Sequence, residues 1–352
     1  MNSILKFIES IRSNYELSDM PFLNRQLKRV KLEKPYTGLK ISHNIPFTKE
    51  TIVKLGILYE GGADLTITSP SFMEVDENLI NHFVDAGGIW KQLHDVNNKE
   101  VFDIHLDCAA ELIFRRSPRI GTVEITGTGT NKYGASKNEY PIISVDKSKI
   151  KSLEGVLGTG EAFVRAFEEL THEDISDKSF MVFGYGKVGK GIVHYLEKKT
   201  KKIVVIDKSL INVQKAKLAG LEAYLFNDKV KIEALAKIVF AVVTATGVKN
   251  SISDNYDKKA FQSKYLANMG GEDEFGYKFD SDEVMCEKRP INFFVEKPTL
   301  MRYLDPVFYA HNQGVDLLMY SNLKNGLHPF PSFISEEVVN DWEFLFNESL
   351  DI

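Results

Sequence analysis

Three glycines, Gly184, Gly186 and Gly189, follow a short apolar run and lead directly into a segment with helical spacing. In a Gly-x-Gly-x-x-Gly turn the first glycine allows the tight bend, the second lets the backbone approach a pyrophosphate, and the third lets the helix pack closely on the strand. The phosphates then meet the free N–H groups at the start of the helix. A second apolar run ends in Asp207, at the distance where a carboxylate binds an adenosine ribose and repels a 2′-phosphate. The pattern therefore predicts a site for NAD rather than NADP.

The composition is that of an ordinary globular protein, and its 352 residues are enough for two domains. A net charge of −5 gives no electrostatic reason to bind nucleic acid or an anionic membrane. Two cysteines, Cys108 and Cys286, are too few for a disulfide framework, which favours a reducing compartment. The longest apolar run, 238–243, is too short to cross a bilayer, and the first residues lack the pattern of a signal peptide. We therefore expect a cytoplasmic protein, and no cluster of residues has the spacing of metal ligands.

Segments with the patterns of strands and helices alternate along the chain, which predicts parallel sheets with helices on their faces. Ahead of the glycine turn, the expected strands are 38–42, 64–68, 102–106, 122–125 and 141–145, and the expected helices are 48–59 and 72–84. After it, a strand at 238–243 leads to Thr244, and a strand at 265–269 leads to Gly270. Ligands of doubly wound sheets bind beyond the carboxyl ends of the strands, so both endings should line the cofactor crevice. A helix at 336–346 closes the chain.

These segments, in this order, resemble the adenosylhomocysteinase family over most of the chain, from 39 to 333 and most closely from 157 to 270. The glycine turn is close to the family's Gly-Tyr-Gly-Asp-Val-Gly-Lys-Gly. Five further segments of this chain are similar to segments of the family. Leu-Gly-Thr-Gly-Glu at 157–161 resembles the family's Tyr-Gly-Thr-Gly-Glu, Thr-Ala-Thr-Gly at 244–247 resembles Thr-Thr-Thr-Gly, and Asn-Met-Gly at 268–270 resembles Asn-Ile-Gly. Thr-Gly-Thr at 126–128 resembles a run of three threonines, and Gly-Leu-His-Pro at 326–329 resembles Gly-His-Pro with one residue inserted.

The resemblance implies an α/β fold with two domains. One is an NAD-binding Rossmann domain with a doubly wound parallel sheet, and the other is a split α/β substrate domain. We expect the first part of the substrate domain at 1–157, the NAD-binding domain at 158–305, and the C-terminal return to the substrate domain at 306–352. The implied chemistry is redox-assisted elimination. A hydride passes from the ribose 3′ carbon to NAD, the ketone acidifies the 4′ proton, and the thiol leaves from the 5′ carbon. Water then adds and the hydride returns.

The resemblance also assigns contacts with NAD to individual residues. These are Gly184, Gly186, Lys187, Val188, Gly189, Asp207, Asn212, Thr126, Thr128, Thr244, Thr246, Gly247, Asn268, Gly270 and Asn322.

The cofactor half of the chain thus keeps the family's pattern, whereas the substrate half departs from it. In the family's tract Leu-Asp-Asp-Gly-Gly-Asp-Leu, the second Asp is a catalytic acid/base and corresponds to Cys108. The other departures are Ile125, next to Glu124, for a glutamate; Glu154 for Asp; Gly155 for Asn; Gly271 for His; and Ile150 or Lys149 for the catalytic lysine.

Seven residues are candidates for catalysis, and four of them have a structural alternative. They are His328, His43, Lys149, Asp107, Cys108, Glu111 and Glu154. The two histidines match substrate-site histidines of the family, or they are packed and turn residues. Cys108 would be a nucleophile only with a lowered pKa, and otherwise it is a small buried residue at a strand end. Lys149 would place a cation near the 3′ oxygen, or it is one of several solvated lysines. Asp107 and Glu111 are replacement acids.

Two functions remain open. The first is an NAD-retaining enzyme that acts on a nucleoside or related sugar other than adenosylhomocysteine. The second is a catalytically inactive NAD-binding paralogue that regulates or partners with another protein, because several catalytic positions have changed. An ordinary 2-hydroxyacid or amino-acid dehydrogenase would explain the glycine turn but not the Thr-Gly-Thr and Gly-Thr-Gly-Glu segments. The expected partner is a small nucleoside-like substrate, with no nucleic acid and no membrane. A homo-oligomer would lack the family's exchange of C-terminal tails, because the chain ends at Ile352 without that tail.

Overall fold

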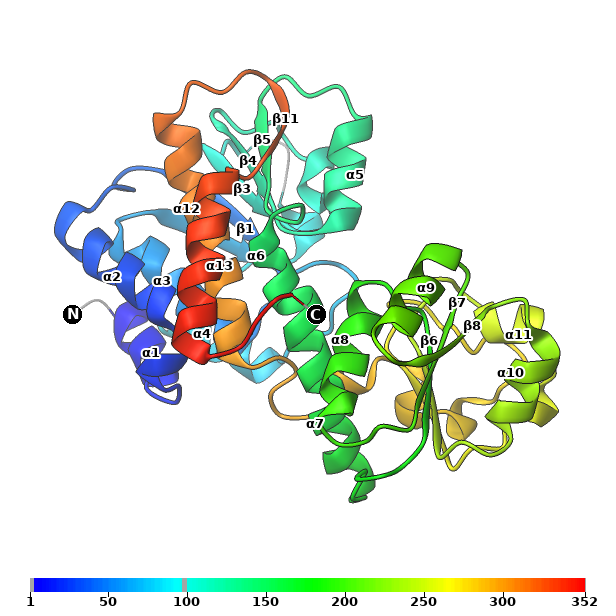
Figure 1. The fold of residues 1–352 in the computed structure, drawn as a ribbon. Coiled ribbons are helices and arrows are strands. Elements are labelled where there is room, and N and C mark those ends of the chain that lie inside the picture. The colour runs from blue at the N-terminus through cyan, green and yellow to red at the C-terminus, as the bar shows by residue number, and fades with distance from the viewer. Residues whose placement is uncertain (1–2, 97–99, 352) are drawn as a thin grey trace. The chain divides into compact units, whose positions relative to one another are not determined.

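The computed structural model describes residues 3–96 and 100–351, and in it the chain forms two compact units (Figure 1). Unit 1 contains the chain up to Leu153 together with Met301–Glu348. Unit 2 contains Glu154–Leu300 and the last residues from Ser349. Within the described ranges, no helix is both long and apolar enough to cross a membrane.

Unit 1 is built on a parallel sheet with the strand order β11-β5-β4-β3-β1-β2. Its strands are β1 (Lys40–Asn44), β2 (Asp64–Thr68), β3 (Ile104–Asp107), β4 (Gly121–Glu124), β5 (Pro141–Ser144) and β11 (Gly326–Pro329). Its helices are α1 (Ser3–Arg12), α2 (Pro21–Glu33), α3 (Lys49–Glu60), α4 (Glu77–Asp85), α5 (Gly127–Ala135), α6 (Lys149–Ser152), α12 (Met301–Tyr320) and α13 (Ser332–Phe346). Strands β3 and β4 bury every residue, as expected of central strands in a parallel sheet covered on both faces.

Short polar side chains begin several helices of unit 1, because they accept hydrogen bonds from the free N–H groups of a first turn. The caps of α3, α4, α5 and α6 are Thr48, Asp76, Thr126 and Ser148. Helix α2 begins differently, with Pro21 at its first position. The buried carboxylate of Asp305, from α12, accepts hydrogen bonds from the N–H groups of Phe22 (2.9 Å) and Leu23 (2.8 Å). A residue distant in sequence thus caps this helix.

Helix α12 packs on the sheet of unit 1 through a small residue. A Cβ at Gly314 would lie 2.6 Å from the side chain of Val123 in β4, so helix and strand approach as closely as glycine allows. Pro306, inside the helix, cannot donate an N–H, which leaves the carbonyl of Arg302 without its helical donor. Trp342 of α13 donates its Nε1–H to that carbonyl at 2.7 Å. Helices α12 and α13 are therefore joined at the point where Pro306 removes a hydrogen bond from α12.

Unit 2 has a parallel sheet with the order β10-β9-β6-β7-β8. Its strands are β6 (Phe180–Phe183), β7 (Ile203–Asp207), β8 (Glu222–Leu225), β9 (Ala241–Thr244) and β10 (Tyr265–Asn268). Its helices are α7 (Thr159–Thr171), α8 (Lys187–Glu197), α9 (Leu210–Leu218), α10 (Lys229–Ala236) and α11 (Ser251–Asn255). The chain moves from β6 to β7 and β8 on one side and then to β9 and β10 on the other. This is the doubly wound sheet that the sequence predicted.

Helices α7 and α8 lie side by side in unit 2 (Figure 1). A Cβ at Gly160 would lie 2.2 Å from the backbone of Gly191, and a Cβ at Gly191 would lie 1.9 Å from the carbonyl of Val156. The two helices therefore touch through their backbones. This contact places the start of α8, where the glycine turn ends, against the segment that leads into α7.

The predicted element types are confirmed, but several boundaries shift. Strand β1 begins at Lys40 rather than at 38, and α4 begins at Glu77 rather than at 72. Strand β9 begins at Ala241, because the apolar residues just before it belong to the turn after α10, where Ile238 is 75% exposed. Helix α12 and strand β11 were not predicted as elements.

Candidate functional site

The glycine turn of unit 2 has the geometry that a dinucleotide requires. Gly184 has a φ of +95°, and a side chain there would meet the carbonyl of Ala245 at 2.3 Å. A side chain at Gly189 would meet the carbonyl of Gly184 at 1.8 Å, so strand and helix pack through backbone alone. Apart from the adjoining backbone, no heavy atom of the described residues lies within 4 Å of the Cβ position that a side chain at Gly186 would occupy. This open space beside the backbone fits the close approach of a pyrophosphate.

Helix α8 begins with backbone donors that its own sequence leaves unpaired. Its N-cap residue is Gly186, which has no side chain to accept from the first turn. The N–H groups at the start of the helix, including those of Lys187 and Val188, therefore remain available for an anion. The side chain of Lys187 is exposed, so these two residues offer mainly backbone donors.

Asp207 lies at the end of β7 with its carboxylate held in place. It accepts hydrogen bonds from the N–H groups of Tyr185 (2.6 Å) and Ser209 (2.7 Å) and from the side-chain amide of Asn212 (3.3 Å). Tyr185 belongs to the glycine turn, so the carboxylate and the turn are directly connected. The structure thus brings together Asp207, Asn212 and the glycine turn, as expected of one cofactor site.

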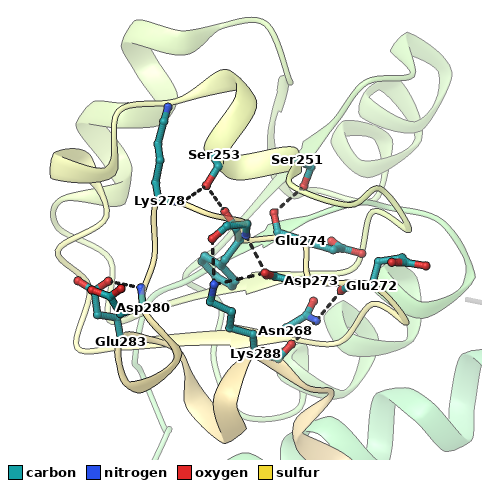
Figure 2. A network of polar contacts seen from close by, with 12 residues as sticks. Ser251, Ser253, Asn268, Glu272, Asp273, Glu274, Lys278, Asp280, Glu283 and Lys288 are labelled. Carbon is teal, nitrogen blue, oxygen red and sulfur yellow. Dashed lines mark hydrogen bonds and ion pairs between the residues drawn. The ribbon is translucent and has the colours of Figure 1, made fainter. Parts of the chain in front are cut away.

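The ends of β9 and β10 are joined by side chains that the sequence assigned to the cofactor. Thr244 donates its hydroxyl to the side-chain oxygen of Asn268 at 2.9 Å. The amide nitrogen of Asn268 donates to the carbonyls of Glu272 (2.8 Å) and Lys288 (2.7 Å), and to that of Gly270 at 3.3 Å (Figure 2). Both side chains are buried, and their polar groups are used within the protein. They shape this edge of the crevice, and direct contact with NAD stays a prediction.

Glu274 fixes the turn that follows β9, and it was not singled out from the sequence. Its carboxylate accepts hydrogen bonds from the N–H (2.8 Å) and hydroxyl (2.8 Å) of Thr246 and from the N–H of Gly247 (2.6 Å). A Cβ at Gly270 would lie 1.8 Å from the same carboxylate, so glycine is required there. Burial raises the pKa of Glu274, while the hydrogen bonds from Thr246 and Gly247 oppose that shift.

In unit 1, Asp107 lies at the carboxyl end of β3 and holds the turn that follows. Its carboxylate accepts from the N–H groups of Cys108 (2.8 Å) and Leu112 (3.0 Å), from the hydroxyl of Tyr133 (2.7 Å) and from the amide of Asn44 (2.9 Å). The side chain is fully buried. Asp107, predicted as a replacement acid, therefore orients the turn in this structure rather than facing an open site.

Glu124, at the end of β4, holds the same turn from the other side. It accepts from the N–H groups of Ala109 (3.2 Å) and Ala110 (3.0 Å) and from the N–H (2.8 Å) and hydroxyl (2.6 Å) of Thr126. Ala109 and Ala110 have φ values of +60° and +54°, a backbone conformation that favours glycine. The strain is compensated by the two buried carboxylates, which together bind the N–H groups of four turn residues.

The environment of this turn raises the pKa values of its acids. Burial raises the pKa of Glu124 to about 8 and that of Asp107 to about 6, and the charge of Asp107 adds to the shift of Glu124. Burial also raises the pKa of Cys108, and Glu124 and Asp107 add to that shift. Cys108 is buried at the end of β3, which agrees with the structural alternative given for it above, and a catalytic role for this thiol stays a prediction.

Two threonines of unit 1 were predicted to reach the cofactor. The Thr126 hydroxyl caps α5 by accepting from the N–H of Gly129 (3.1 Å), and it also accepts from the N–H of Ala109 (2.9 Å). Thr128, in the first turn of the same helix, is exposed. Thr126 thus stabilises the turn, and contact of either residue with NAD stays a prediction.

His43 points into the core of unit 1 and not toward an open surface. It is fully buried, and its Nε2 lies 2.9 Å from the Nζ of Lys54 in α3. His311 of α12 lies near it, with ring centroids 6.3 Å apart. Burial lowers the pKa of His43 and of Lys54 well below their usual ranges, and the charge of Lys54 lowers that of His43 further. Lys54 was missed, although a lysine inside the apolar run of this helix was a signal in the sequence.

The two residues that could correspond to the family's catalytic lysine, Lys149 and Ile150, lie at the surface and in the interior, respectively. Lys149 is exposed and forms an ion pair with Glu336 of α13 (3.7 Å), while the N–H of Ile150 faces the hydroxyl of Ser335 in the interior. Lys151, in the same short helix, is partly buried; its charge opposes the rise in the pKa of Cys108 and adds to the lowering of the pKa of His311.

The two candidate glutamates have separate surroundings. Glu111 accepts hydrogen bonds from the N–H (2.8 Å) and the hydroxyl of Ser71. Ser71 in turn lines a cavity of about 450 Å³ beyond the end of β2, together with Trp90 and Arg115. Glu154 lies in a π-helical turn at the start of unit 2 and is partly buried. The catalytic roles of both stay predictions.

His328 and Asn322 follow α12 in unit 1. His328 lies in β11, which pairs with β5, and its Nε2 is 2.6 Å from the carbonyl of Lys324. Asn322 is exposed in the connection before that strand. Their assigned contacts with substrate and NAD stay predictions. Among the described residues, no group of three or more His, Cys, Asp or Glu could hold a metal ion.

Comparisons with known proteins bear on the same segments. Residues 155–289 match the family model for "S-adenosyl-L-homocysteine hydrolase, NAD binding domain". An adenosylhomocysteinase of Sulfurisphaera tokodaii is 28% identical over 274 residues, which are 71% of this chain and 64% of that protein. An S-inosyl-L-homocysteine hydrolase of Methanocaldococcus jannaschii is 26% identical over 275 residues, which are 71% of this chain and 65% of that protein. The chain therefore matches slightly less than two thirds of the length of these two relatives.

The fold of unit 2 and its glycine turn define an NAD-binding α/β protein with a Rossmann domain. The family model and the relatives go one step further: residues 155–289 match the NAD-binding domain of S-adenosyl-L-homocysteine hydrolase, the chain is similar to adenosylhomocysteinases over about 71% of its length, and the cofactor is NAD. Among solved structures, a dipicolinate synthase chain from Bacillus halodurans overlays with a TM-score of 0.48 and 12% identity, covering 80% of this chain and 98% of that one.

Proposed function

We propose that the chain is an NAD-dependent enzyme that transiently oxidises the sugar of a nucleoside or a related substrate, and that standard adenosylhomocysteine hydrolysis is not its main activity. The observation that carries the proposal is a complete NAD cradle in a chain whose substrate-side residues differ from the family's. Relatives of similar identity are named for two different nucleosides, adenosyl and inosyl. A change of nucleoside therefore has precedent among proteins similar to this one.

Unit 2 would hold the cofactor with the residues described above. The glycine turn and the start of α8 would bind the pyrophosphate, and Asp207 would bind the adenosine ribose. Bound NAD would supply reversible hydride acceptance, which makes a neighbouring C–H of the sugar acidic for a limited time. These residues bind and orient the cofactor, so the chemistry of the substrate depends on other groups.

We assign unit 1 as the substrate domain, with its reacting end at the turn after β3. Asp107 and Glu124 would act by holding this turn rigid, because both carboxylates are engaged by internal donors. Lys151 of α6, which is partly buried, is the cation that we propose for this end of the sheet. A fixed cation stabilises negative charge that develops on a sugar oxygen. Lys151 would then take the role that the sequence suggested for Lys149.

Exchange of solvent deuterium tests the proposed oxidation. The NAD-loaded protein is incubated in D₂O with adenosine, inosine and other nucleosides, and the recovered nucleosides are analysed by NMR. We expect deuterium at the 4′ carbon of at least one nucleoside, and we expect no exchange with Gly186→Val protein, in which the pyrophosphate position is filled. Absence of exchange with every nucleoside, despite bound NAD, would overturn the proposal.

A thiol-release assay tests the substrate side. Adenosylhomocysteine should be hydrolysed well below the rate typical of metabolic enzymes, about 1 s⁻¹ or faster, because Cys108 replaces an acid/base carboxylate and has a raised pKa. Turnover at or above that rate would show that the changed residues do not matter and that the standard activity is retained.

The second candidate function is an NAD-binding paralogue without catalysis. It is favoured by two observations: both carboxylates at the turn accept internal hydrogen bonds, and Lys149 pairs with Glu336 at the surface. This protein would bind NAD as a structural or regulatory ligand. It would show no deuterium exchange with any nucleoside, so the exchange assay distinguishes the candidates.

A further inference from the structure

The carboxylate of Glu274 connects the loop after β10 with the turn after β9. Glu274 is fully buried, one oxygen accepts from the N–H and hydroxyl of Thr246, and the other accepts from the N–H of Gly247. The backbone carbonyl of Glu274 accepts in addition from the hydroxyl of Ser251 at 3.3 Å (Figure 2). Each oxygen thus has a separate donor set.

The order of strands in unit 2 indicates which half of NAD this turn faces. Strand β7, which carries Asp207 at its end, lies on one side of β6, and strands β9 and β10 lie on the other. In a doubly wound sheet the dinucleotide lies across the carboxyl ends of the strands, with its pyrophosphate at the central glycine turn. Because the adenosine half is on the side of β7, the nicotinamide half must lie on the side of β9 and β10. Thr246 and Gly247 follow β9 directly.

We propose that Glu274 is a positioning residue for the nicotinamide half of NAD, which acts by fixing the backbone of Thr246 and Gly247. The proposal rests on the NAD-binding domain alone and is independent of the chemistry proposed for the substrate. It goes beyond a general role in folding, because it predicts that removing the carboxylate weakens one half of the cofactor contact and leaves the other half unchanged.

The exchange of one atom in the variant Glu274→Gln is sufficient for the test. A glutamine retains one acceptor oxygen, but its NH₂ group cannot accept a hydrogen bond, so either Thr246 or Gly247 loses its partner. The backbone of the turn would then change conformation so that the donor finds another acceptor, because an unpaired buried N–H is costly. The close approach of Gly270 to the carboxylate leaves little room for the side chain to move away. We therefore expect the turn to change and the fold to persist.

The experiment is calorimetric titration of the full chain, freed of bound nucleotide, with NAD and with AMP as the adenosine half. For Glu274→Gln we expect NAD affinity to fall about tenfold or more, the loss of one or two hydrogen bonds, and AMP affinity to remain within about twofold of the unaltered protein. The matched control is Glu272→Gln, an exposed neighbour whose backbone carbonyl alone is used. It should change neither affinity.

Two results would overturn the proposal. One is an unchanged NAD affinity in Glu274→Gln, and the other is a parallel fall of NAD and AMP affinities, which would indicate a general structural role. If Glu274→Gln fails to fold, Glu274→Asp supplies the same test, because its shorter side chain draws the carboxylate back from Thr246 and Gly247. The same selective loss for NAD supports the proposal, and a parallel or absent loss contradicts it.

Discussion

Asp207 has its carboxylate oriented by three donors of the protein, two of them backbone N–H groups. The carboxylate is therefore oriented before a nucleotide binds, so that binding does not have to restrict the rotation of this side chain. A hydroxyl pair of an adenosine ribose would add to these contacts, whereas a 2′-phosphate would meet a like charge. The preference between the two cofactors thus depends on a single residue.

We expect Asp207→Ala to weaken NAD binding by about 1–3 kcal/mol, because charge-assisted hydrogen bonds are lost. Calorimetry with NAD and NADP measures the effect, and Asp254→Ala, an exposed residue of α11, serves as the control. Equal affinity of the unaltered protein for NAD and NADP would contradict the assignment.

Glu124 should make the stability of unit 1 depend on pH. Its pKa rises from 4.5 to about 8 on folding because of burial. The folded state therefore binds a proton more tightly than the unfolded state, and stability decreases as the pH rises from about 4.5 to about 8. Asp107 adds a decrease of the same sign between 3.8 and about 6. Above pH 8 the contribution of both groups is constant.

Urea unfolding at several pH values tests this expectation. Between pH 6 and pH 8 the free energy of unfolding should decrease by about 1.4 kcal/mol per pH unit from Glu124, and Glu124→Gln should remove this slope. The exposed Glu139→Gln should leave it in place. A slope that persists in Glu124→Gln would show that another group is responsible.

At the scale of elements, the glycine turn combines two different requirements. Gly189 is needed for folding, since a side chain there would overlap the carbonyl of Gly184 at 1.8 Å. Gly186 is not needed for folding, since nothing lies within 4 Å of its missing side chain. We therefore expect substitution of Gly189 to affect mainly stability and substitution of Gly186 to affect mainly NAD binding.

Alanine at each position should give opposite outcomes. Gly189→Ala should lower the melting temperature clearly, because backbone would have to move apart. Gly186→Ala should unfold within about 1 kcal/mol of the unaltered protein but bind NAD weakly, because the methyl group lies where a pyrophosphate approaches. Gly155→Ala, which also meets nothing within 4 Å, is the control and should retain both properties. Full NAD affinity in Gly186→Ala would contradict this account of the turn.

The contact between α12 and α13 offers a second test at this scale. Trp342→Phe removes the side-chain N–H that donates to the Arg302 carbonyl, to which Pro306 cannot donate, and should cost about 1–3 kcal/mol of unfolding free energy. Phe344, which is 85% exposed in the same helix, gives the control Phe344→Ala with little change. If the two variants unfold alike, the hydrogen bond to α12 contributes nothing.

The elements also show what could be predicted from the sequence. The βαβ unit around Gly184 was predicted because its glycines and Asp207 have local spacing. Helix α12 was missed because Pro306 argues against a helix, and its compensation by Trp342 comes from a different part of the chain. Strand β11 was missed because it is short and only partly buried, and it is defined by pairing with β5. Glu274 and Lys151 were missed for the same reason: their importance lies in contacts, not in spacing.

At the scale of the whole molecule, the two units differ in how they use the chain. Unit 2 is formed almost entirely by one continuous segment, Glu154–Leu300, whereas unit 1 needs two segments. Unit 2 also has its own buried core, centred on Met181, Phe183 and their neighbours. A continuous segment with its own core has what independent folding requires.

A fragment of residues 154–300 should therefore fold by itself and bind NAD. Circular dichroism and calorimetry measure both properties, with Asp207→Ala in the same fragment as the control for binding. A fragment that stays unfolded under conditions where the full chain is folded would show that unit 2 depends on unit 1.

The central claim is that the NAD of this protein is reduced and reoxidised by a nucleoside-like substrate. The most direct measurement mixes the purified, NAD-loaded protein with a panel of nucleosides, without added cofactor, and follows the absorbance of reduced nicotinamide. We predict that at least one nucleoside produces this absorbance, that denaturation then releases NADH, and that the Asp207→Ala protein shows neither. If denaturation releases only NAD after every nucleoside, the claim is contradicted and the protein binds its cofactor without using it.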